Sequence, residues 1–226
     1  MIRGILVISL VCAAAEVSAE PLRILFIGNS LTAWNDLPSM VETLAVAGGH
    51  ERPIVRSVTR SGFSLEDHWN EGEAQKVVAG SKWNFVILQQ GPSALIESRQ
   101  LLIAYARRFA EIIRRAGASP ALYMVWPSTT RRFDFAGVST SYTAAARAVK
   151  GELLPAGDVW REVLRAHPDI HLYSDDGLHP TLAGSYVAAL VIYRGIYKPS
   201  SLALPAFGLP EADARRLQAA VLAIRH

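Results

Sequence analysis

Cysteine is almost absent from this sequence of 226 residues, and that scarcity excludes several kinds of chemistry. The single cysteine, Cys12, lies in an N-terminal segment that we expect to be removed. Residues 20–226 then contain no thiol, so disulfides, a cysteine nucleophile and cysteine-rich zinc or iron–sulfur sites are excluded.

An excess of one charge is also missing. Lysine and arginine number 23 against 20 aspartates and glutamates, which leaves a formal net charge of +3. The arginine pairs are far apart in the sequence, so nothing resembles the basic stripe of a nucleic-acid-binding protein. After residue 19 no apolar run reaches the length of about 18 residues that a membrane span needs, and we expect no stable membrane insertion of the mature chain.

The first segment, residues 1–19, has the organisation of a secretory signal peptide. Arg3 precedes an apolar run from Ile5 to Ala15, and the small residues around Ala19 form a cleavage site before Glu20. An uncleaved anchor is the alternative, whereas lipid attachment at Cys12 is disfavoured by the preceding valine. We therefore predict a secreted or periplasmic protein with one mature domain, residues 20–226.

Short apolar runs alternate with longer helical patterns along this domain. Such alternation predicts βαβ units, and hence a parallel sheet covered by helices on both faces. The expected strands are 22–27, 54–59, 84–88 and 121–126, with shorter ones near 153 and at 170–173. The expected helices are 37–47, 65–79, 97–116, 141–150, 159–166, 181–197 and 211–224.

Candidate catalytic residues follow the strands, where ligands bind in sheets of this kind. Ser30 follows the first strand in the string Gly-Asn-Ser-Leu-Thr, near the start of a helix. Asp176 precedes His179 by three residues in the string Asp-Gly-Leu-His-Pro, a spacing that lets the carboxylate orient the imidazole. A nucleophile, a base and an orienting carboxylate are thus present, although Ser30 or Asp176 taken alone is typical of a helix cap.

These two strings resemble the first and last motifs of the SGNH hydrolases, also called GDSL-like lipases and esterases. The resemblance covers residues 22–197 and implies a flavodoxin-like three-layer α/β/α sandwich with about five parallel strands. It also implies ester hydrolysis through an acyl-enzyme on Ser30, with no metal or other cofactor. The pattern Gly-x-Ser-x-Gly is absent, which argues against an α/β-hydrolase.

The resemblance also implies an oxyanion hole. The backbone N–H groups of Ser30 and Gly62 match two of its donors, and Asn29 stands where the family usually has aspartate. The third motif departs from the family, because a glutamine pair replaces the usual asparagine, as in branches that include acetylesterases acting on sugars. Either Gln89 or Gln90 can donate an amide N–H, and the strand register that decides between them is not encoded locally.

Three aromatic residues, Trp34, Phe63 and Trp126, follow strand ends and either shape an acyl or sugar pocket or cover the rim of the sheet. We expect the substrate to be a short acyl ester, an acetyl group on a small molecule or glycan. Two alternatives keep the same fold: a non-catalytic protein that binds an envelope glycan, and an acyltransferase that uses the same triad.

Overall fold

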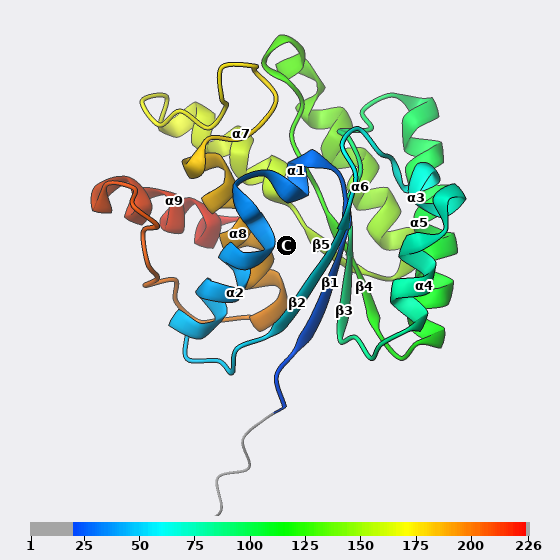
Figure 1. Ribbon diagram of the computed structural model, residues 1–226. Helices are drawn as coiled ribbons and strands as arrows, with labels where there is room; N and C mark the ends of the chain where they lie inside the picture. The colour runs from blue at the N-terminus through cyan, green and yellow to red at the C-terminus, as the bar shows by residue number, and fades with distance from the viewer. Residues whose placement is uncertain (1–19, 225–226) are drawn as a thin grey trace, which may run out of the picture.

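The computed structural model describes residues 20–224, and the predicted signal peptide, residues 1–19, lies outside them (Figure 1). One sheet of five parallel strands, in the order β2-β1-β3-β4-β5, runs through the domain. The strands are β1 (Arg23–Gly28), β2 (Ile54–Thr59), β3 (Phe85–Leu88), β4 (Ser119–Tyr123) and β5 (Glu152–Leu154).

Helices cover both faces of the sheet, which is seen nearly edge-on in Figure 1. On one face α2 packs against α8, and α8 contacts α7 and α9; on the other, α5 contacts α3, α4 and α6. The bounds are α1 (Ser30–Ala33), α2 (Leu37–Ala47), α3 (Leu65–Glu71), α4 (Glu73–Ala79), α5 (Ile96–Arg115), α6 (Phe135–Val149), α7 (Ala156–Ala166), α8 (Leu182–Tyr197) and α9 (Glu211–Ala223). The expected three-layer α/β/α sandwich is confirmed.

Burial explains the strand sequences. Residues Ile24 to Ile27 of β1 are completely buried, because this central strand is covered by helices on both faces and pairs with β2 and β3. Strands buried on both faces are continuously apolar rather than alternating. Strand β2 lies at the edge of the sheet, and most of its side chains are correspondingly exposed or half-buried.

Three predicted elements differ most from the structure, whereas the strand expected at 121–126 is displaced to Ser119–Tyr123 and the helix expected at 159–166 begins at Ala156. The helix expected over 65–79 is divided at Gly72, whose φ of 86° is the left-handed conformation that ends helices. Helix α6 begins at Phe135 rather than 141, because Phe135, Val138 and Tyr142 form a buried stripe that the preceding arginines obscured in the sequence. The strand expected at 170–173 is only a single bridge between Tyr173 and Pro180.

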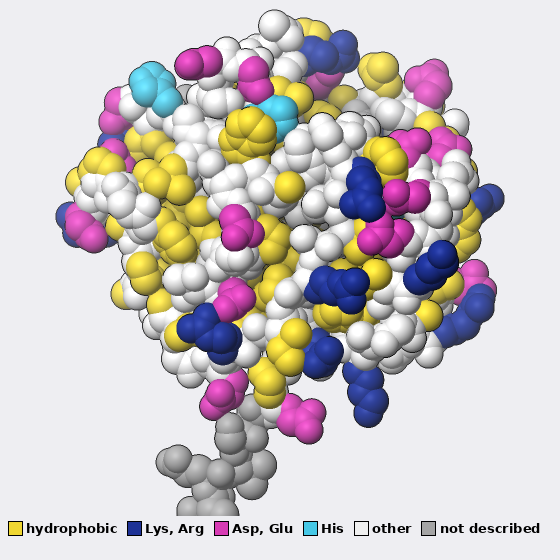
Figure 2. Space-filling view, viewed as in Figure 1, with side chains coloured by type: hydrophobic (Ala, Val, Ile, Leu, Met, Phe, Trp, Pro, Cys, Tyr) yellow, Lys and Arg dark blue, Asp and Glu magenta, His cyan; other side chains and the backbone are white. Residues whose placement is uncertain are grey.

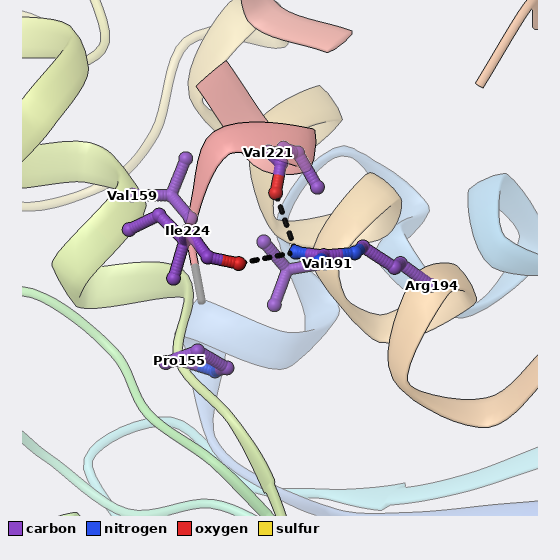
Figure 3. A pocket seen from close by; sticks show the side chains of 6 residues that line it. All are labelled: Pro155, Val159, Val191, Arg194, Val221 and Ile224. Atoms are coloured by element: carbon purple, nitrogen blue, oxygen red, sulfur yellow. Dashed lines mark hydrogen bonds between the residues drawn. The ribbon is translucent and has the colours of Figure 1, made fainter. Parts of the chain in front are cut away.

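The C-terminal helix α9 is fastened to α8 by Arg194. The guanidinium donates to the backbone carbonyls of Val221, at 2.6 Å, and Ile224, at 3.0 Å (Figure 3). The remaining side chains drawn in Figure 3 are apolar, so this hollow between helices is part of the packing of the domain.

The surface has no large field of one sign on the face drawn in Figure 2, where basic and acidic side chains are mixed. Among residues 20–224, no helix is long and apolar enough to cross a membrane.

Candidate active site

Ser30 is the first residue of α1, directly beyond the carboxyl end of β1. The N-cap of this helix is Asn29, whose side-chain oxygen accepts from the N–H of Leu31 at 3.1 Å. The Ser30 side chain is therefore not needed as a cap. Its Oγ lies instead 2.9 Å from Nε2 of His179, a residue 149 positions away in the sequence.

His179 lies in the loop before α8, and its other ring nitrogen meets Asp176. The distance from His179 Nδ1 to Asp176 Oδ2 is 2.5 Å. An ionised carboxylate only accepts hydrogen bonds, so this contact fixes the proton on Nδ1 and leaves Nε2 as an acceptor for the Ser30 hydroxyl. The cap of α8 is Thr181, which accepts from the N–H of Gly184, so Asp176 is not needed there either.

Asp176 is held by its own loop. Its Oδ1 accepts from the backbone N–H groups of Leu178, at 2.8 Å, and His179, at 2.9 Å, and from the Ser174 hydroxyl. These bonds, that of Leu178 first and then that of the His179 ring, hold the pKa of Asp176 well below its ordinary value. The carboxylate, whose side chain is 47% exposed, therefore stays ionised at neutral pH.

The three side chains thus form a continuous hydrogen-bonded series, from carboxylate to imidazole to hydroxyl. A base within hydrogen-bond distance of a hydroxyl, itself oriented by a third group, is the arrangement that activates a serine nucleophile. The Trp34 ring lies against one face of the His179 ring, with centroids 4.2 Å apart and an interplanar angle of 23°.

Similar proteins were found by comparison of structures and not by comparison of sequences. No family model and no curated protein matches the sequence. The structure is similar to that of a protein from Slackia heliotrinireducens assigned to the SGNH hydrolases, with 28% identity, a TM-score of 0.68 and coverage of 78% of this chain and 99% of that one. This match supports assignment of the chain to the SGNH hydrolase superfamily.

Two less similar hydrolases have the same fold. A lipase/acylhydrolase from Enterococcus faecalis is 18% identical, with a TM-score of 0.62 over 78% of this chain and 96% of that one. An acetyl-xylooligosaccharide esterase from Geobacillus is 15% identical, with a TM-score of 0.53 over 78% of this chain and 93% of that one. At these identities the two structures show a shared fold.

Two backbone N–H groups predicted as oxyanion donors lie at the same edge of the sheet. Ser30 begins α1, so its N–H has no acceptor within the helix. Gly62 lies in the turn after β2 with a φ of 75°, and a side chain at that position would point into open space. The positive φ explains why glycine suits this turn.

Gln89 is completely buried, and its amide is fully used. Its oxygen accepts from the Asn29 N–H at 2.9 Å and from the Thr32 hydroxyl at 2.7 Å. Its nitrogen donates to Asn29 Oδ1 at 3.0 Å and to the Gln90 carbonyl at 2.7 Å. Since a primary amide has only two N–H groups, Gln89 has none left for an oxyanion, and that expectation is corrected.

Gln90 is the member of the pair with a donor to spare. Its oxygen accepts from the Leu65 N–H at 3.2 Å, and its nitrogen donates one N–H to the Ser93 hydroxyl at 2.7 Å. The buried Tyr142 hydroxyl fixes the backbone beside it by donating to the Gln90 carbonyl at 2.6 Å. One N–H of the Gln90 amide is uncommitted among these contacts.

The three predicted pocket aromatics have different surroundings. Trp34 is 41% exposed beside His179, and Phe63 is half-buried, with its carbonyl accepting from Asn29 Nδ2 at 3.0 Å. Trp126 is completely buried, stacked on Trp160, so the prediction that it contacts substrate is wrong. Its indole N–H instead donates to the Leu178 carbonyl at 3.0 Å and supports the loop that carries His179.

His68 and Asn35 support the site although sequence reasoning assigned neither to it. His68, completely buried on α3, has Nε2 2.8 Å from the carbonyl of Gly28, two residues before Ser30. Asn35 contacts the loop of His179 through Pro180. No local pattern signals either role, because both contacts join segments that are far apart in the sequence.

Proposed function

We propose that this SGNH hydrolase is a serine esterase that forms an acyl-enzyme on Ser30. The observation that carries the proposal is the 2.9 Å contact between Ser30 Oγ and Nε2 of His179, together with the 2.5 Å contact between His179 and Asp176. The caps of α1 and α8 are Asn29 and Thr181, so helix capping explains neither Ser30 nor Asp176.

In the first half of the cycle, Ser30 Oγ attacks the ester carbonyl carbon while His179 Nε2 takes the hydroxyl proton. The resulting imidazolium is stabilised by Asp176, which stays ionised. When the carbon–oxygen bond of the ester breaks, His179 returns the proton to the departing alcohol oxygen, and the acyl group stays on Ser30. Water then attacks the acyl-enzyme with His179 as base, releases the acid and restores the Ser30 hydroxyl.

The oxyanion of each tetrahedral intermediate would be held by the backbone N–H groups of Ser30 and Gly62 and by the spare N–H of Gln90. Donors fixed before the reaction begins need no rearrangement as the charge develops, and the loss of one donor lowers kcat by about 10²–10³-fold. The bonds of Gln90 to Leu65 and Ser93 support this role, because they fix the amide plane.

The substrate we propose is a short acyl ester, an acetyl group carried by a carbohydrate. The half-exposed ring of Trp34 beside His179 offers an apolar face of the kind that sugar rings pack against, and Phe63 lies on the adjacent loop. The acetyl-xylooligosaccharide esterase from Geobacillus has the same fold, which makes the chemistry compatible with this scaffold.

The test is hydrolysis of p-nitrophenyl acetate, butyrate and octanoate by the purified protein and by its Ser30→Ala variant. We expect the acetate to be the best substrate, and we expect the variant to lose several orders of magnitude in kcat, because triad members act as a unit. Wild-type rates in Ser30→Ala would disprove the esterase mechanism, and a preference for octanoate would disprove the short-acyl assignment. A folded protein with no activity on any of these esters, or on acetylated sugars, would instead favour a binding function.

A further inference from the structure

The segment between α1 and α2 has an unusual backbone. Trp34, Asn35 and Asp36 form a tight turn in which Asn35 has a φ of 53° and Asp36 a φ of 49°. Two consecutive non-glycine residues in the left-handed region cost free energy, even though asparagine and aspartate tolerate it best. Such conformations persist where surrounding contacts impose them, and they are concentrated at functional sites.

The contacts that impose this turn lead to the loop of His179. Asn35 Nδ2 donates to the Pro180 carbonyl at 3.2 Å and to the Ser185 hydroxyl at 3.0 Å, and Ser185 is buried in the first turn of α8. Pro180 directly follows His179. The same turn presents Trp34, whose ring stacks on the imidazole.

Asp36 differs sharply from its neighbour. It has a similar φ, but its side chain makes no cap hydrogen bond at the start of α2. A left-handed backbone conformation is therefore not sufficient to connect this turn to the His179 loop. Only Asn35 of the two adds a side-chain bond to that loop.

We propose that Asn35 is a positioning residue, which ties the nucleophile helix to the His179 loop and holds Trp34 against the imidazole, so that Nε2 stays aligned with Ser30 Oγ. We call the bonds of Asn35 to Pro180 and Ser185 the brace, and the other contacts of the His179 loop show why it is needed. The bonds of Asp176 and Ser174 lie within the loop, and Trp126 adds a bond to the Leu178 carbonyl. The Asn35 bonds, in contrast, fix the loop relative to Ser30. The proposal rests on the proposed esterase function for its effect on rate, but the alignment itself is independent of it.

The test compares Asn35→Gly with Asp36→Gly. Each variant relieves a left-handed residue, but only Asn35→Gly removes the two bonds to Pro180 and Ser185. We expect Asn35→Gly to lower kcat for p-nitrophenyl acetate by about 10- to 100-fold, with little change in KM, because displacement of a reacting group by about 1 Å costs on that order. Asp36→Gly should keep the wild-type kcat.

A second variant acts on the partner of Asn35. Ser185→Ala removes one of the two acceptors, and we expect a smaller decrease in kcat. In the double variant the two effects should not add, because both act through the same bond. Additive effects, or an unchanged kcat in Asn35→Gly, would overturn the proposal.

A measurement that needs no substrate separates this proposal from the esterase assignment. The proton on His179 Nδ1, donated to Asp176 across 2.5 Å, should give a far-downfield proton NMR signal, assigned by its loss in His179→Gln. We expect that signal to broaden in Asn35→Gly and to stay sharp in Asp36→Gly. If the wild type hydrolyses no ester but the signals behave in this way, the esterase assignment fails and the brace stands. Equally sharp signals in both variants would disprove the brace.

Discussion

Two segments bring the proposed catalytic groups together, and they are stabilised in opposite ways. The nucleophile turn, residues 28–32, is held from outside: Gln89 contacts Asn29 and Thr32, and His68 contacts Gly28. The base loop, residues 174–180, has an internal set of bonds that Asp176 accepts from Leu178 and His179, to which Trp126 and Asn35 add single contacts from outside. The first is buried and the second is partly exposed. Chemistry and stability should therefore be separable in the base loop and inseparable in the nucleophile turn.

The largest effect is expected from Asp176→Asn, which tests the base loop. The amide keeps an oxygen for the N–H groups of Leu178 and His179, but its nitrogen cannot accept the His179 Nδ1 proton, so the imidazole takes the wrong tautomer. We expect kcat for p-nitrophenyl acetate to fall by about 10⁴-fold, the scale of that tautomer change in a serine protease. The melting temperature should change little, because the amide oxygen keeps the two backbone bonds that hold the loop.

The matched control for Asp176→Asn is Asp175→Asn. Asn29→Ala would be a poor control, because it also removes the N-cap of α1. Asp175 is adjacent, carries the same charge and is not the partner of His179. A comparable loss of activity in Asp175→Asn would show that charge in the loop matters rather than the contact with His179.

The next effect is expected from Gln89→Glu, which tests the nucleophile turn. One carboxylate oxygen could still accept from Asn29 and Thr32, but the other would face two acceptors, Asn29 Oδ1 and the Gln90 carbonyl. A buried group left without its donors costs about 1–3 kcal/mol, and more when it is charged. We expect the free energy of unfolding to fall by at least that amount and activity to fall with it.

The matched control for Gln89→Glu is Gln100→Glu on the exposed side of α5. This variant should remain within about 0.5 kcal/mol of the wild type, as surface substitutions usually do. Urea unfolding monitored by circular dichroism measures both variants. A stable but inactive Gln89→Glu protein would show that activity and stability are separable in the nucleophile turn as well, which contradicts the proposed difference between the two segments.

The same contrast explains what could be predicted from the sequence. The base loop is local, so the three-residue spacing of Asp176 and His179 was sufficient to predict their contact, and the alternation of apolar runs was sufficient to predict the sheet. The roles of Gln89, His68 and Asn35 depend on contacts across 60, 40 and 145 residues, which no local pattern records. Trp126 was misassigned for the same reason: a position just after a strand does not reveal which side chains will stack over it.

Asn29 illustrates the point at a single position. The family usually has aspartate there, and the sequence alone offered no reason for the change. In the structure the Asn29 amide nitrogen donates to the Phe63 carbonyl at 3.0 Å, and its oxygen accepts from Gln89. An aspartate would place a second acceptor against that carbonyl, so Asn29 and the glutamine of the third motif form one arrangement rather than two separate departures.

The smallest expected effect is on the pH dependence of the free energy of unfolding. It tests whether the nucleophile turn is buried where His68 contacts Gly28. Burial lowers the pKa of His68 below its ordinary value of 6.5, against the opposing effects of its bond to Gly28 and of the charge on Glu71. The unfolded chain therefore binds a proton at a higher pH than the folded chain does. As pH falls below about 6.5, the free energy of unfolding should decrease, and the decrease attributable to His68 should end once the pH passes its lower, folded-state pKa.

Urea unfolding between pH 7.5 and about 5 measures this slope in the wild type and in His68→Gln, which lacks the titrating group but can still donate to the Gly28 carbonyl. We expect a shallower slope in His68→Gln than in the wild type. Identical slopes in the wild type and His68→Gln would mean that the fold accommodates a charged imidazole beneath Gly28. Burial of the nucleophile turn would then not prevent protonation of His68. The two segments would differ in whether their contacts are local or distant in the sequence, and not in their access to solvent.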